Sequence, residues 1–239
     1  MIAGIMQPYF FPYIGYFDLI FRSDVWVVFD IAQFQPKSWM YRNRMLHPTK
    51  GWQYISVTLS GKSQNMCICD VFLSDPFADC QKIIRQLEHY KKRAPFYSNV
   101  ISLVHEAFSR ATSKKLVDLN VACLAAVCEH LKIEFQPVVA STEQFPLAEI
   151  QHPGQWALEI SACLGADTYI NPPNGRPLFR PQEFHERGIH LAFTELSKVV
   201  YDCTPYTFEP HLSILDVLMW NSPDQIRNYL RQSELTFEA

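Results

Sequence analysis

The start of the chain alternates between short apolar runs and polar breaks. Residues 1–6 and 25–30 are each typical of a buried strand, and apolar residues at helical spacing over 13–22 predict a helix between them. Strand, helix and strand in this order predict a βαβ unit of a parallel sheet. Ligands of such sheets bind beyond the carboxyl ends of the strands, so the polar residues that follow each strand are the first candidates for a site.

The next region predicts a hairpin. Residues 52–59 alternate apolar and polar side chains, as a half-buried strand does, and residues 66–73 form a second strand-like stretch after a loop at 61–65. Together these two stretches predict an antiparallel hairpin, inserted into the main sheet or lying at its edge.

The middle of the chain is helical in pattern, and the βαβ rhythm returns after it. Helices are predicted over 79–90 and 97–131, with a break at Pro95 and a helix cap at Ser113. The later elements are expected to be strands at 135–140, 168–171 and 191–194 and helices at 156–164, 213–221 and 223–231. The predicted fold is α/β: a single domain over 1–239 with a mainly parallel sheet flanked by helices, an edge hairpin, and a helical subdomain inserted at 75–132.

Composition narrows the class of partner. Of the 239 residues, 48% are hydrophobic and 14% aromatic, which is ample for a packed core. A net charge of −3 and a pI near 6.2 favour a small-molecule partner over nucleic acid. We expect no membrane-spanning segment, since no apolar run approaches about 18 residues. Seven cysteines without a regular framework, and a start without a signal-like segment, predict a cytoplasmic protein.

A dense polar and aromatic segment follows the second predicted strand and contains Gln33, Trp39, Arg42, Asn43 and Arg44. Two arginines that flank an asparagine can present fork-shaped donors to a phosphate or carboxylate, while tryptophan offers a face to a sugar or base ring. A surface loop whose arginines pair with carboxylates is the alternative. The position after a strand end favours a site.

Other polar residues lie near the ends of predicted elements. Asp30 could be a general base, a metal ligand or a hydroxyl acceptor, or it could cap a turn or helix. Asn171 and Arg176 follow a predicted strand and could reach a ligand or belong to an ordinary turn. Ser213 has the spacing of a helix cap relative to Asp216, whose role stays open.

The loop between the first strand and the first helix carries Gln7, Tyr9, Tyr13 and Tyr16. Its strand, loop and helix are similar to the nucleotidyltransferase superfamily, in which a His-x-Gly-His motif at this junction contacts nucleotide phosphates. Here the corresponding residues read Tyr13-Ile14-Gly15-Tyr16. Tyrosine can donate a hydrogen bond but lacks the charge of an imidazole near neutral pH, and a tyrosine-rich packing corner is the alternative.

The sequence predicts no metal site. Cys67-x-Cys69 and the pair His185 and His190 lack partners at standard zinc spacing, which favours scattered thiols and imidazoles. A cysteine–histidine acyl-enzyme stays open, but no motif selects one cysteine. The sequence contains no dinucleotide-binding motif, no phosphate-binding loop of the Walker type and no serine-hydrolase motif.

Several motifs together carry a family resemblance over nearly the whole chain. They are Gln7-Pro8-Tyr9-Phe10-Phe11-Pro12-Tyr13-Ile14-Gly15-Tyr16-Phe17, the strand Asp24 to Asp30, Ser38-Trp39 with Arg42-Asn43-Arg44, Tyr169-Ile170-Asn171-Pro172 with Gly175-Arg176, and Leu212-Ser213-Ile214-x-Asp216. With these motifs the chain resembles the WbqC-like protein family. That family occurs in bacterial O-antigen and other surface-polysaccharide gene clusters, and it has been proposed to include glycine transferases that acylate an amino sugar. The chain departs from the common pattern at residues 173–175 and 201–203, which bears on the identity of donor and acceptor.

The resemblance implies an enzyme that transfers an aminoacyl or acyl group to the amine of a nucleotide-linked or lipid-linked amino sugar. An activated donor is needed, such as an acyl-carrier or coenzyme A thioester, which makes a carrier protein a further expected partner. In this interpretation Asp30 deprotonates the amine, and Asn43 or Gln7 stabilises the oxyanion. Arg42 and Arg44 bind the sugar diphosphate.

The remaining motif residues are expected to bind substrate. With the two arginines, this set is Tyr9, Tyr13, Tyr16, Gln33, Trp39, Arg42, Arg44, Asn171, Arg176 and Asp216. We expect these residues, although distant in the sequence, to converge on a common pocket. Two other functions stay open: a nucleotidyltransferase-like or ATP-dependent acyl-activating enzyme, and a non-catalytic protein that binds glycan precursors.

Overall fold

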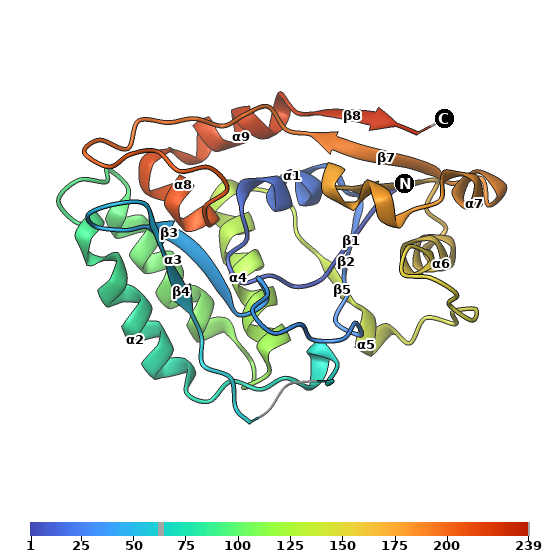
Figure 1. Ribbon diagram of the computed structural model, residues 1–239, viewed down its shortest axis with the longest axis horizontal. Coiled ribbons are helices and arrows are strands. Elements are labelled where there is room, and N and C mark those ends of the chain that lie inside the picture. Colours follow the sequence, from blue (N-terminus) through green and yellow to red (C-terminus); the bar gives the residue numbers. More distant parts are fainter. Residues whose placement is uncertain (62–64, 239) are drawn as a thin grey trace.

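The computed structural model describes residues 1–61 and 65–238, and a six-stranded sheet lies at its centre (Figure 1). The strand order is β5–β2–β1–β6–β7–β8, in which β8 runs antiparallel to β7 and every other neighbouring pair is parallel. The strands are β1 (Ile2–Met6), β2 (Val25–Val28), β5 (Pro137–Val139), β6 (Thr168–Asn171), β7 (His190–Glu195) and β8 (Glu234–Phe237). The mainly parallel α/β sheet predicted from the sequence is therefore confirmed.

Helices cover both faces of the sheet. They are α1 (Ile14–Arg22), α2 (Pro76–Leu87), α3 (Tyr97–Arg110), α4 (Leu116–Leu131), α5 (Ala140–Glu143), α6 (Gln155–Leu164), α7 (Pro181–Glu186), α8 (Ile214–Trp220) and α9 (Pro223–Arg231), with shorter 3₁₀ turns η1 (Ile68–Asp70), η2 (Glu88–Tyr90) and η3 (Pro173–Leu178). No helix in the described ranges is long and apolar enough to cross a membrane.

Two apolar cores lie on opposite faces of the sheet. In β2, Trp26 and Val28 belong to the larger core, which also contains α1 to α4, α8 and α9, while Val27 belongs to the smaller core with α6 and α7. Successive strand side chains point to opposite faces, so this split is what a strand buried on both sides produces. Figure 1 shows α6 and α7 on one side of β1 and β2 and the helices α2 to α4 on the other.

The chain order reverses between β1 and β6. From β1 the sheet grows through β2 to β5 on one side, and the chain then returns to place β6 and β7 on the other side. The loops that leave β1 and β6 at their carboxyl ends therefore diverge, which is where ligands bind in open sheets of this kind. Gln7 follows β1 and Asn171 ends β6, so both lie at this point.

The hairpin is present, but its partner strand differs from the prediction. β4 (Trp52–Ser56) pairs antiparallel with β3 (Arg42–Leu46), and the two form a sheet separate from the main one. The prediction that residues 66–73 form the second strand was wrong, because this stretch contains η1 and meets residue 59 only in an isolated bridge, Leu59 to Leu73. Part of the predicted loop at 61–65 lies outside the described residues.

The helical middle of the chain has the predicted pattern with shifted boundaries: the helix predicted over 79–90 is α2, at Pro76–Leu87, followed by the turn η2, and α4 begins after the predicted cap at Ser113. The helices α2 to α4 lie within residues 76–131 and pack into the same core as α1 and α8. That this segment is an inserted subdomain stays a prediction. Ser113 does not cap α4: the helix follows Lys115, and Ser113 instead accepts a hydrogen bond from the Lys115 N–H and donates one to Asp118. β8 had no counterpart among the predicted elements.

Candidate functional site

The carboxyl end of β6 is closed by its own loop. The side-chain amide of the buried Asn171 donates to the Tyr169 hydroxyl at 2.6 Å and lies 3.7 Å from the Met6 sulfur on β1. The loop folds back so closely that a side chain at Gly175 would collide with the Asn171 carboxamide. The loop therefore packs directly against Asn171, and Gly175 is needed for the close approach.

Arg176 in the same loop is already neutralised. Its guanidinium lies 4.3 Å from the centre of the Phe193 ring on β7 and forms an ion pair with Glu238 after β8. About two fifths of the side chain is exposed. A substrate anion would have to compete with the Glu238 carboxylate for this arginine.

The three tyrosines of the loop after β1 divide into two kinds. Tyr16 is fully buried with its ring 5.1 Å from that of Trp26, and its hydroxyl donates to the Gln7 carbonyl at 2.8 Å. Burial raises the pKa of Tyr16 well above its ordinary value. Tyr9 and Tyr13 are only partly buried. Tyr16 thus fixes the loop, while Tyr9 and Tyr13 can still contact a ligand.

Asn43 anchors the same loop from the hairpin. Its side-chain amide donates to the carbonyls of Phe10 at 3.1 Å and Phe11 at 2.9 Å, and its side-chain oxygen accepts from the Arg44 N–H. The Ser213 hydroxyl also donates to the Phe11 carbonyl, at 2.7 Å. Phe11 has a φ of 39°, a left-handed conformation that costs energy for a residue with a side chain. These contacts stabilise that conformation and use every polar atom of the Asn43 side chain.

Asn120 on α4 is a positioning residue that the sequence analysis missed. It is fully buried, and its side-chain amide donates to the carbonyls of Pro8 at 2.9 Å and Met40 at 2.8 Å. One side chain thus ties the loop after β1 to the segment that leads into β3. An asparagine within an apolar helix pattern was the available signal, since a buried amide needs partners outside its helix.

Asp30 is buried rather than open to a ligand. Its two carboxylate oxygens accept hydrogen bonds from the Ser141 N–H at 2.9 Å and the Ser141 hydroxyl at 2.6 Å. Ser141 lies in α5, directly after β5. The contact links the carboxyl ends of β2 and β5, and among the described residues Asp30 forms no ion pair with the arginines with which it was grouped in the sequence analysis.

Asp216 is likewise enclosed. It accepts hydrogen bonds from the hydroxyls of Tyr90 and, at 2.6 Å, Tyr201. Tyr90 also accepts a hydrogen bond from the Leu46 N–H at 3.0 Å, which connects this group to the end of β3. Burial raises the pKa of Asp216 to about 6, although the two tyrosine hydroxyls oppose the shift.

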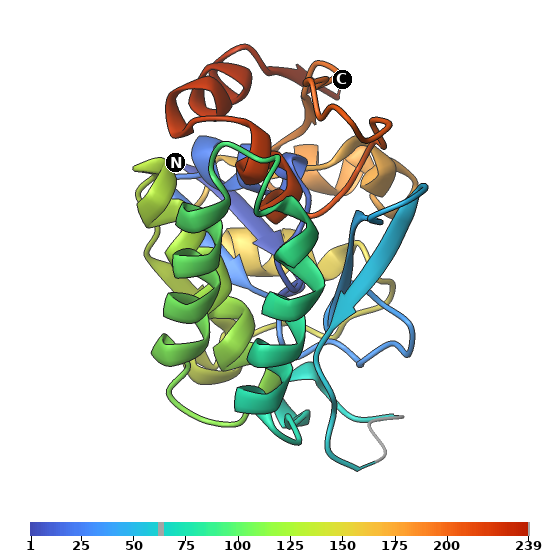
Figure 2. The ribbon, with the colours of Figure 1, turned by 90° about the vertical axis from the view of Figure 1, so that its left-hand side faces the viewer.

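The outer face of the hairpin carries arginines and aromatic rings side by side. Arg42 and Arg44 point to this face from β3, and Trp52 and Tyr54 from β4, with Trp39 beside them. We call these five residues the arginine–aromatic face. The three rings are 38%, 40% and 36% exposed for Trp39, Trp52 and Tyr54 respectively. In Figure 2 the hairpin stands at the edge of the molecule, apart from the main sheet.

The two guanidinium groups of this face stack on its rings. Arg42 lies 4.2 Å from the centre of the Tyr54 ring, and Arg44 lies 5.4 Å from Trp39 and 5.1 Å from Trp52. Their polar contacts are with backbone carbonyls, those of Lys37 for Arg42 and His211 for Arg44. Neither forms an ion pair with a carboxylate within residues 1–61 and 65–238, so both positive charges remain available to an anion.

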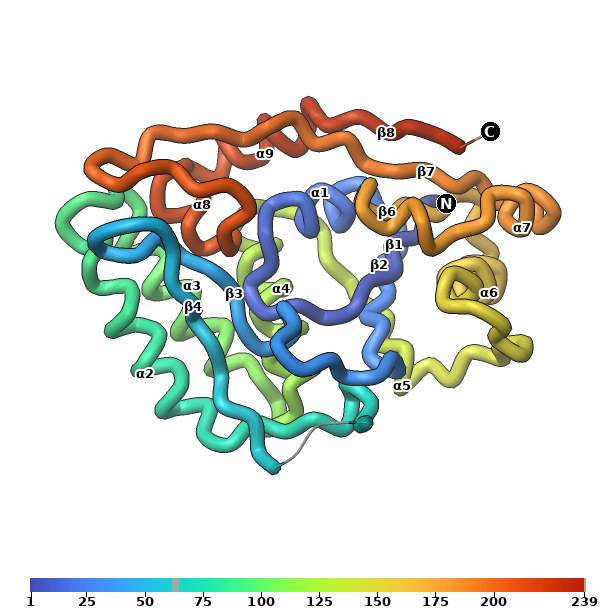
Figure 3. The backbone as a smooth tube through the Cα atoms, viewed as in Figure 1, coloured from blue at the N-terminus to red at the C-terminus, as the bar shows by residue number. Residues whose placement is uncertain are grey.

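The arginine–aromatic face continues into the loop after β1 through His211. This exposed histidine presents its carbonyl to Arg44 at 3.2 Å, and its ring centre lies 6.3 Å from that of Tyr13. Figure 3 shows the loop running from β1 toward the hairpin before it turns up into α1. His211, Trp52 and Tyr54 were absent from the predicted set; Trp52 and Tyr54 share a strand face by their spacing, but β3 opposite them was not predicted.

The remaining predicted residue, Gln33, is exposed and lies away from the guanidinium contacts. Its side-chain amide donates to the Asn65 side chain at 3.2 Å. The structure thus brings Tyr13, Trp39, Arg42 and Arg44 into one connected surface, with Gln7 and Tyr9 in the adjoining loop. Asp30, Arg176 and Asp216 are instead each paired with other residues of the protein, namely Ser141, Glu238, and Tyr90 with Tyr201.

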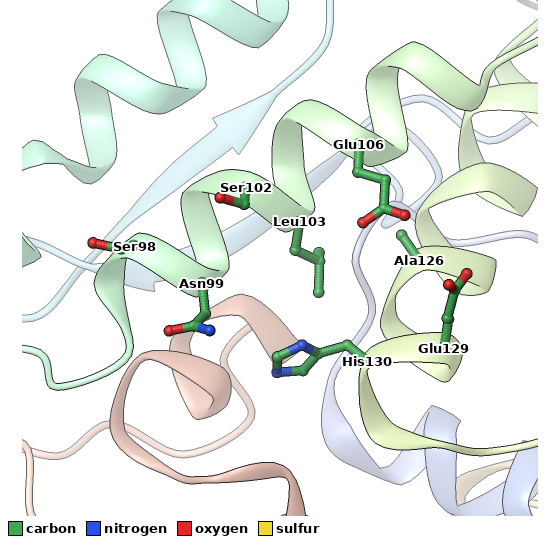
Figure 4. Close-up of a pocket in the computed structure, with 8 residues that line it drawn as sticks. All are labelled: Ser98, Asn99, Ser102, Leu103, Glu106, Ala126, Glu129 and His130. Carbon is green, nitrogen blue, oxygen red and sulfur yellow. The ribbon is translucent and has the colours of Figure 1, made fainter.

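A groove of about 450 Å³ lies elsewhere, between α3 and α4 (Figure 4). It is lined by Ser98, Asn99, Ser102, Leu103, Glu106, Ala126, Glu129 and His130. Both glutamates form ion pairs with Arg110. The groove contains none of the residues predicted to bind substrate, so it does not mark the site described above.

Comparison with known proteins agrees with the motifs. The sequence matches the WbqC-like protein family over residues 7–228. It is 26% identical over 236 residues to Uncharacterized protein Rv1507c of Mycobacterium tuberculosis, which covers 96% of this chain and 99% of the relative. No solved structure matches significantly. Because the family match extends over most of the chain, the protein belongs to the WbqC-like protein family.

Proposed function

We propose that the protein is a transferase that acylates the amine of an amino sugar carried on a diphosphate, and that the arginine–aromatic face binds the carrier. One observation carries this proposal. Two guanidinium groups are held against exposed rings on one strand face, and no carboxylate of the described residues neutralises either of them.

The chemistry of the face suits a nucleotide-linked or lipid-linked sugar. Guanidinium groups form charge-assisted hydrogen bonds with phosphate oxygens, often in pairs. Exposed tryptophan and tyrosine rings can stack on a base or pack against the apolar face of a sugar. Arg42 and Arg44 are two residues apart on β3, roughly 7 Å along the strand, so both long side chains can reach one diphosphate.

Two residues beside the arginine–aromatic face, one in the loop after β1 and one before α8, supply groups for the transfer itself. The attacking amine must lose a proton while its C–N bond to the acyl carbon forms and the C–S bond of the thioester donor breaks. We assign the proton acceptor to His211, whose exposed ring lies near that of Tyr13 and whose backbone carbonyl binds Arg44, because an imidazole nitrogen can accept a proton from the amine. The proton then passes to the leaving thiolate. Gln7, partly exposed at the end of β1, is assigned to hydrogen-bond the acyl oxygen.

Asp30 and Asn43 are given a different role from the one implied by the family resemblance. Both Asp30 carboxylate oxygens and all polar atoms of the Asn43 side chain are engaged within the protein. We therefore propose that they position the strand ends and the loop after β1 rather than contact the reacting atoms.

Binding of uridine diphosphate glucosamine, which carries a free amine, tests the proposal. Isothermal titration calorimetry should show a 10-fold to 100-fold loss of affinity, about 1.4 to 2.8 kcal/mol, when Arg42 and Arg44 are both replaced by alanine. The control variant Arg231→Ala, which removes an exposed arginine on α9 that contacts Asn228, should bind as the wild type does. Equal affinity of all three folded proteins for this ligand, or no binding by any, would contradict the proposal.

The reaction can be tested in cells. In a strain that lacks the gene, mass spectrometry of the surface polysaccharide should show loss of one acyl substituent with the glycan backbone intact. Wild-type protein should restore the substituent and Arg42→Ala should not. An unchanged polysaccharide, a missing sugar unit, or ATP-dependent pyrophosphate exchange by the purified protein would each point to a different function.

A further inference from the structure

Three potential metal ligands lie together in a four-residue segment that contributes no residue to the arginine–aromatic face. The thiols of Cys67 and Cys69 and the carboxylate of Asp70 lie within 4.8 Å of one another. Both thiols are partly buried and Asp70 is exposed. Within residues 1–61 and 65–238 no other group of three histidine, cysteine or acidic side chains is gathered this closely.

The backbone of this segment is held in place. The Ile68 N–H donates to the Ala32 carbonyl and the Cys69 N–H to the Asp30 carbonyl, both at 3.0 Å, and Cys67 forms an antiparallel bridge with Gln33. The Asp70 N–H closes the 3₁₀ turn onto the Cys67 carbonyl at 3.1 Å. The backbone that carries the ligands is thus hydrogen-bonded to the segment that follows β2, which limits the reorganisation that binding an ion would require.

The charges around Cys69 favour a bound cation. The Cys67 sulfur and the Asp70 carboxylate lie within 4.8 Å of the Cys69 sulfur, and each of the three groups carries a negative charge when it binds a metal. Two thiolates beside a carboxylate would repel one another without a counter-ion. A divalent cation removes that repulsion by taking the place of the two thiol protons.

We propose that Cys67, Cys69 and Asp70 bind one Zn²⁺ ion through two sulfurs and one carboxylate oxygen. Thiolate and carboxylate ligands in a tetrahedral arrangement are typical of zinc, and three protein ligands leave the fourth position to water or another external ligand. Binding releases one proton from each thiol, with no change of oxidation state. The cysteine spacing alone favoured no metal; the fold adds Asp70 and the fixed backbone.

Cobalt substitution tests the site without any need for activity. The reduced wild-type protein should bind one Co²⁺ per chain with a sulfur-to-cobalt charge-transfer band, and Zn²⁺ should displace it. Cys67→Ser and Cys69→Ser should abolish the band, and Asp70→Asn should weaken metal affinity at least about 10-fold. Cys163→Ser, which removes an exposed cysteine outside the cluster, should leave the band unchanged.

A second measurement on the wild-type protein guards against misfolded variants. Bound Zn²⁺ should protect Cys67 and Cys69, but not Cys163, from alkylation, as read by peptide mass spectrometry. The proposal is overturned if the charge-transfer band is absent, if it survives in a folded Cys67→Ser and Cys69→Ser double variant, or if zinc gives no protection. A disulfide between Cys67 and Cys69 that forms in place of metal binding would overturn it too.

Discussion

The two faces of the β3–β4 hairpin use polar residues in opposite ways. On the inner face Asn43 is buried, and its side chain makes three hydrogen bonds, each to a backbone group of the protein. On the outer face Arg42 and Arg44 lie against exposed rings, with no carboxylate partner among the described residues. The inner face holds the loop after β1, and the outer face leaves charge and aromatic surface available.

The difference follows from strand geometry. Successive side chains of a strand point to opposite sides, so three consecutive residues of one motif cannot share one task. Arg42 and Arg44 can meet the same ligand, while Asn43 between them faces the core. A motif therefore combines residues that bind with residues that shape the backbone, and burial with satisfied hydrogen bonds distinguishes the two.

Replacing Asn43 should produce the largest effect on stability. In Asn43→Leu the carbonyl of Phe10 loses its Asn43 partner, Phe11 keeps only Ser213, and the strained conformation of Phe11 loses support. The Arg44 N–H loses its Asn43 partner as well, and because a buried polar group without a partner costs about 1 to 3 kcal/mol, we expect a loss of roughly 2 to 6 kcal/mol in the free energy of unfolding. Urea unfolding followed by circular dichroism measures it.

The neighbouring arginine provides the matched comparison. Arg44→Ala removes an outer-face side chain with one backbone hydrogen bond and two ring contacts, and it should lower the free energy of unfolding by less than about 1 kcal/mol. If both variants lose similar stability, the division between a binding face and a positioning face is wrong.

The next effect concerns pH and the inner end of the hairpin. The pKa of Asp216 is raised by burial to about 6, above the value near 4 of an unfolded chain. Between these values the native state holds more protons, so this carboxyl lowers stability as pH rises from about 4 to about 6. Asp216→Asn lacks this contribution. Its free energy of unfolding, relative to that of the wild type, should therefore increase by up to roughly 3 kcal/mol as pH rises from about 4 to about 6.

An exposed carboxylate gives the opposite sign. Hydrogen bonds from Thr204 lower the pKa of Asp202, so its contribution to stability is present above its unfolded pKa and is lost as pH falls. The free energy of unfolding of Asp202→Asn, relative to that of the wild type, should therefore decrease as pH rises. Urea unfolding at a series of pH values measures both differences, and parallel curves for Asp216→Asn and the wild type would contradict the assignment.

Much of the fold could be predicted because apolar periodicity reports burial. β6 and the helices α1, α6 and α9 lie within about a residue of their predicted ranges, since each carries a clear run or stripe of apolar side chains. β3 was missed for a physical reason. Its outward positions are Arg42 and Arg44, whose guanidinium groups stack on aromatic rings. Because charged residues occupy these positions, the pattern of the strand was not recognised as that of a half-buried strand.

The site was predictable in its residue types and less so in its geometry. The motif of Arg42 and Arg44 indicated an anion-binding surface, and their stacking on rings supports that hypothesis. The sequence could not show that Asp30 is enclosed by Ser141, because the two residues lie 111 positions apart and meet only when β5 pairs with β2. Grouping by polarity and order along the chain therefore overestimated how many residues share one surface.

The smallest expected effect concerns the rings of the outer face. Trp52 is 40% exposed and lies 5.1 Å from the Arg44 guanidinium. Because an exposed cation–π contact contributes about 0.5 to 1 kcal/mol, Trp52→Ala should weaken binding of uridine diphosphate glucosamine only about 2-fold to 5-fold. Calorimetry would detect this change.

Phe77 on α2 is the matched control for that loss of aromatic surface. It is 75% exposed and forms no ring or cation contact with the arginine–aromatic face, so Phe77→Ala should leave the affinity unchanged. If Phe77→Ala weakens binding as much as Trp52→Ala does, the loss reflects general aromatic surface rather than the ordering of Arg44. A loss confined to Trp52→Ala, with unchanged unfolding free energy, would instead mean that the ring acts through the ligand and the guanidinium beside it.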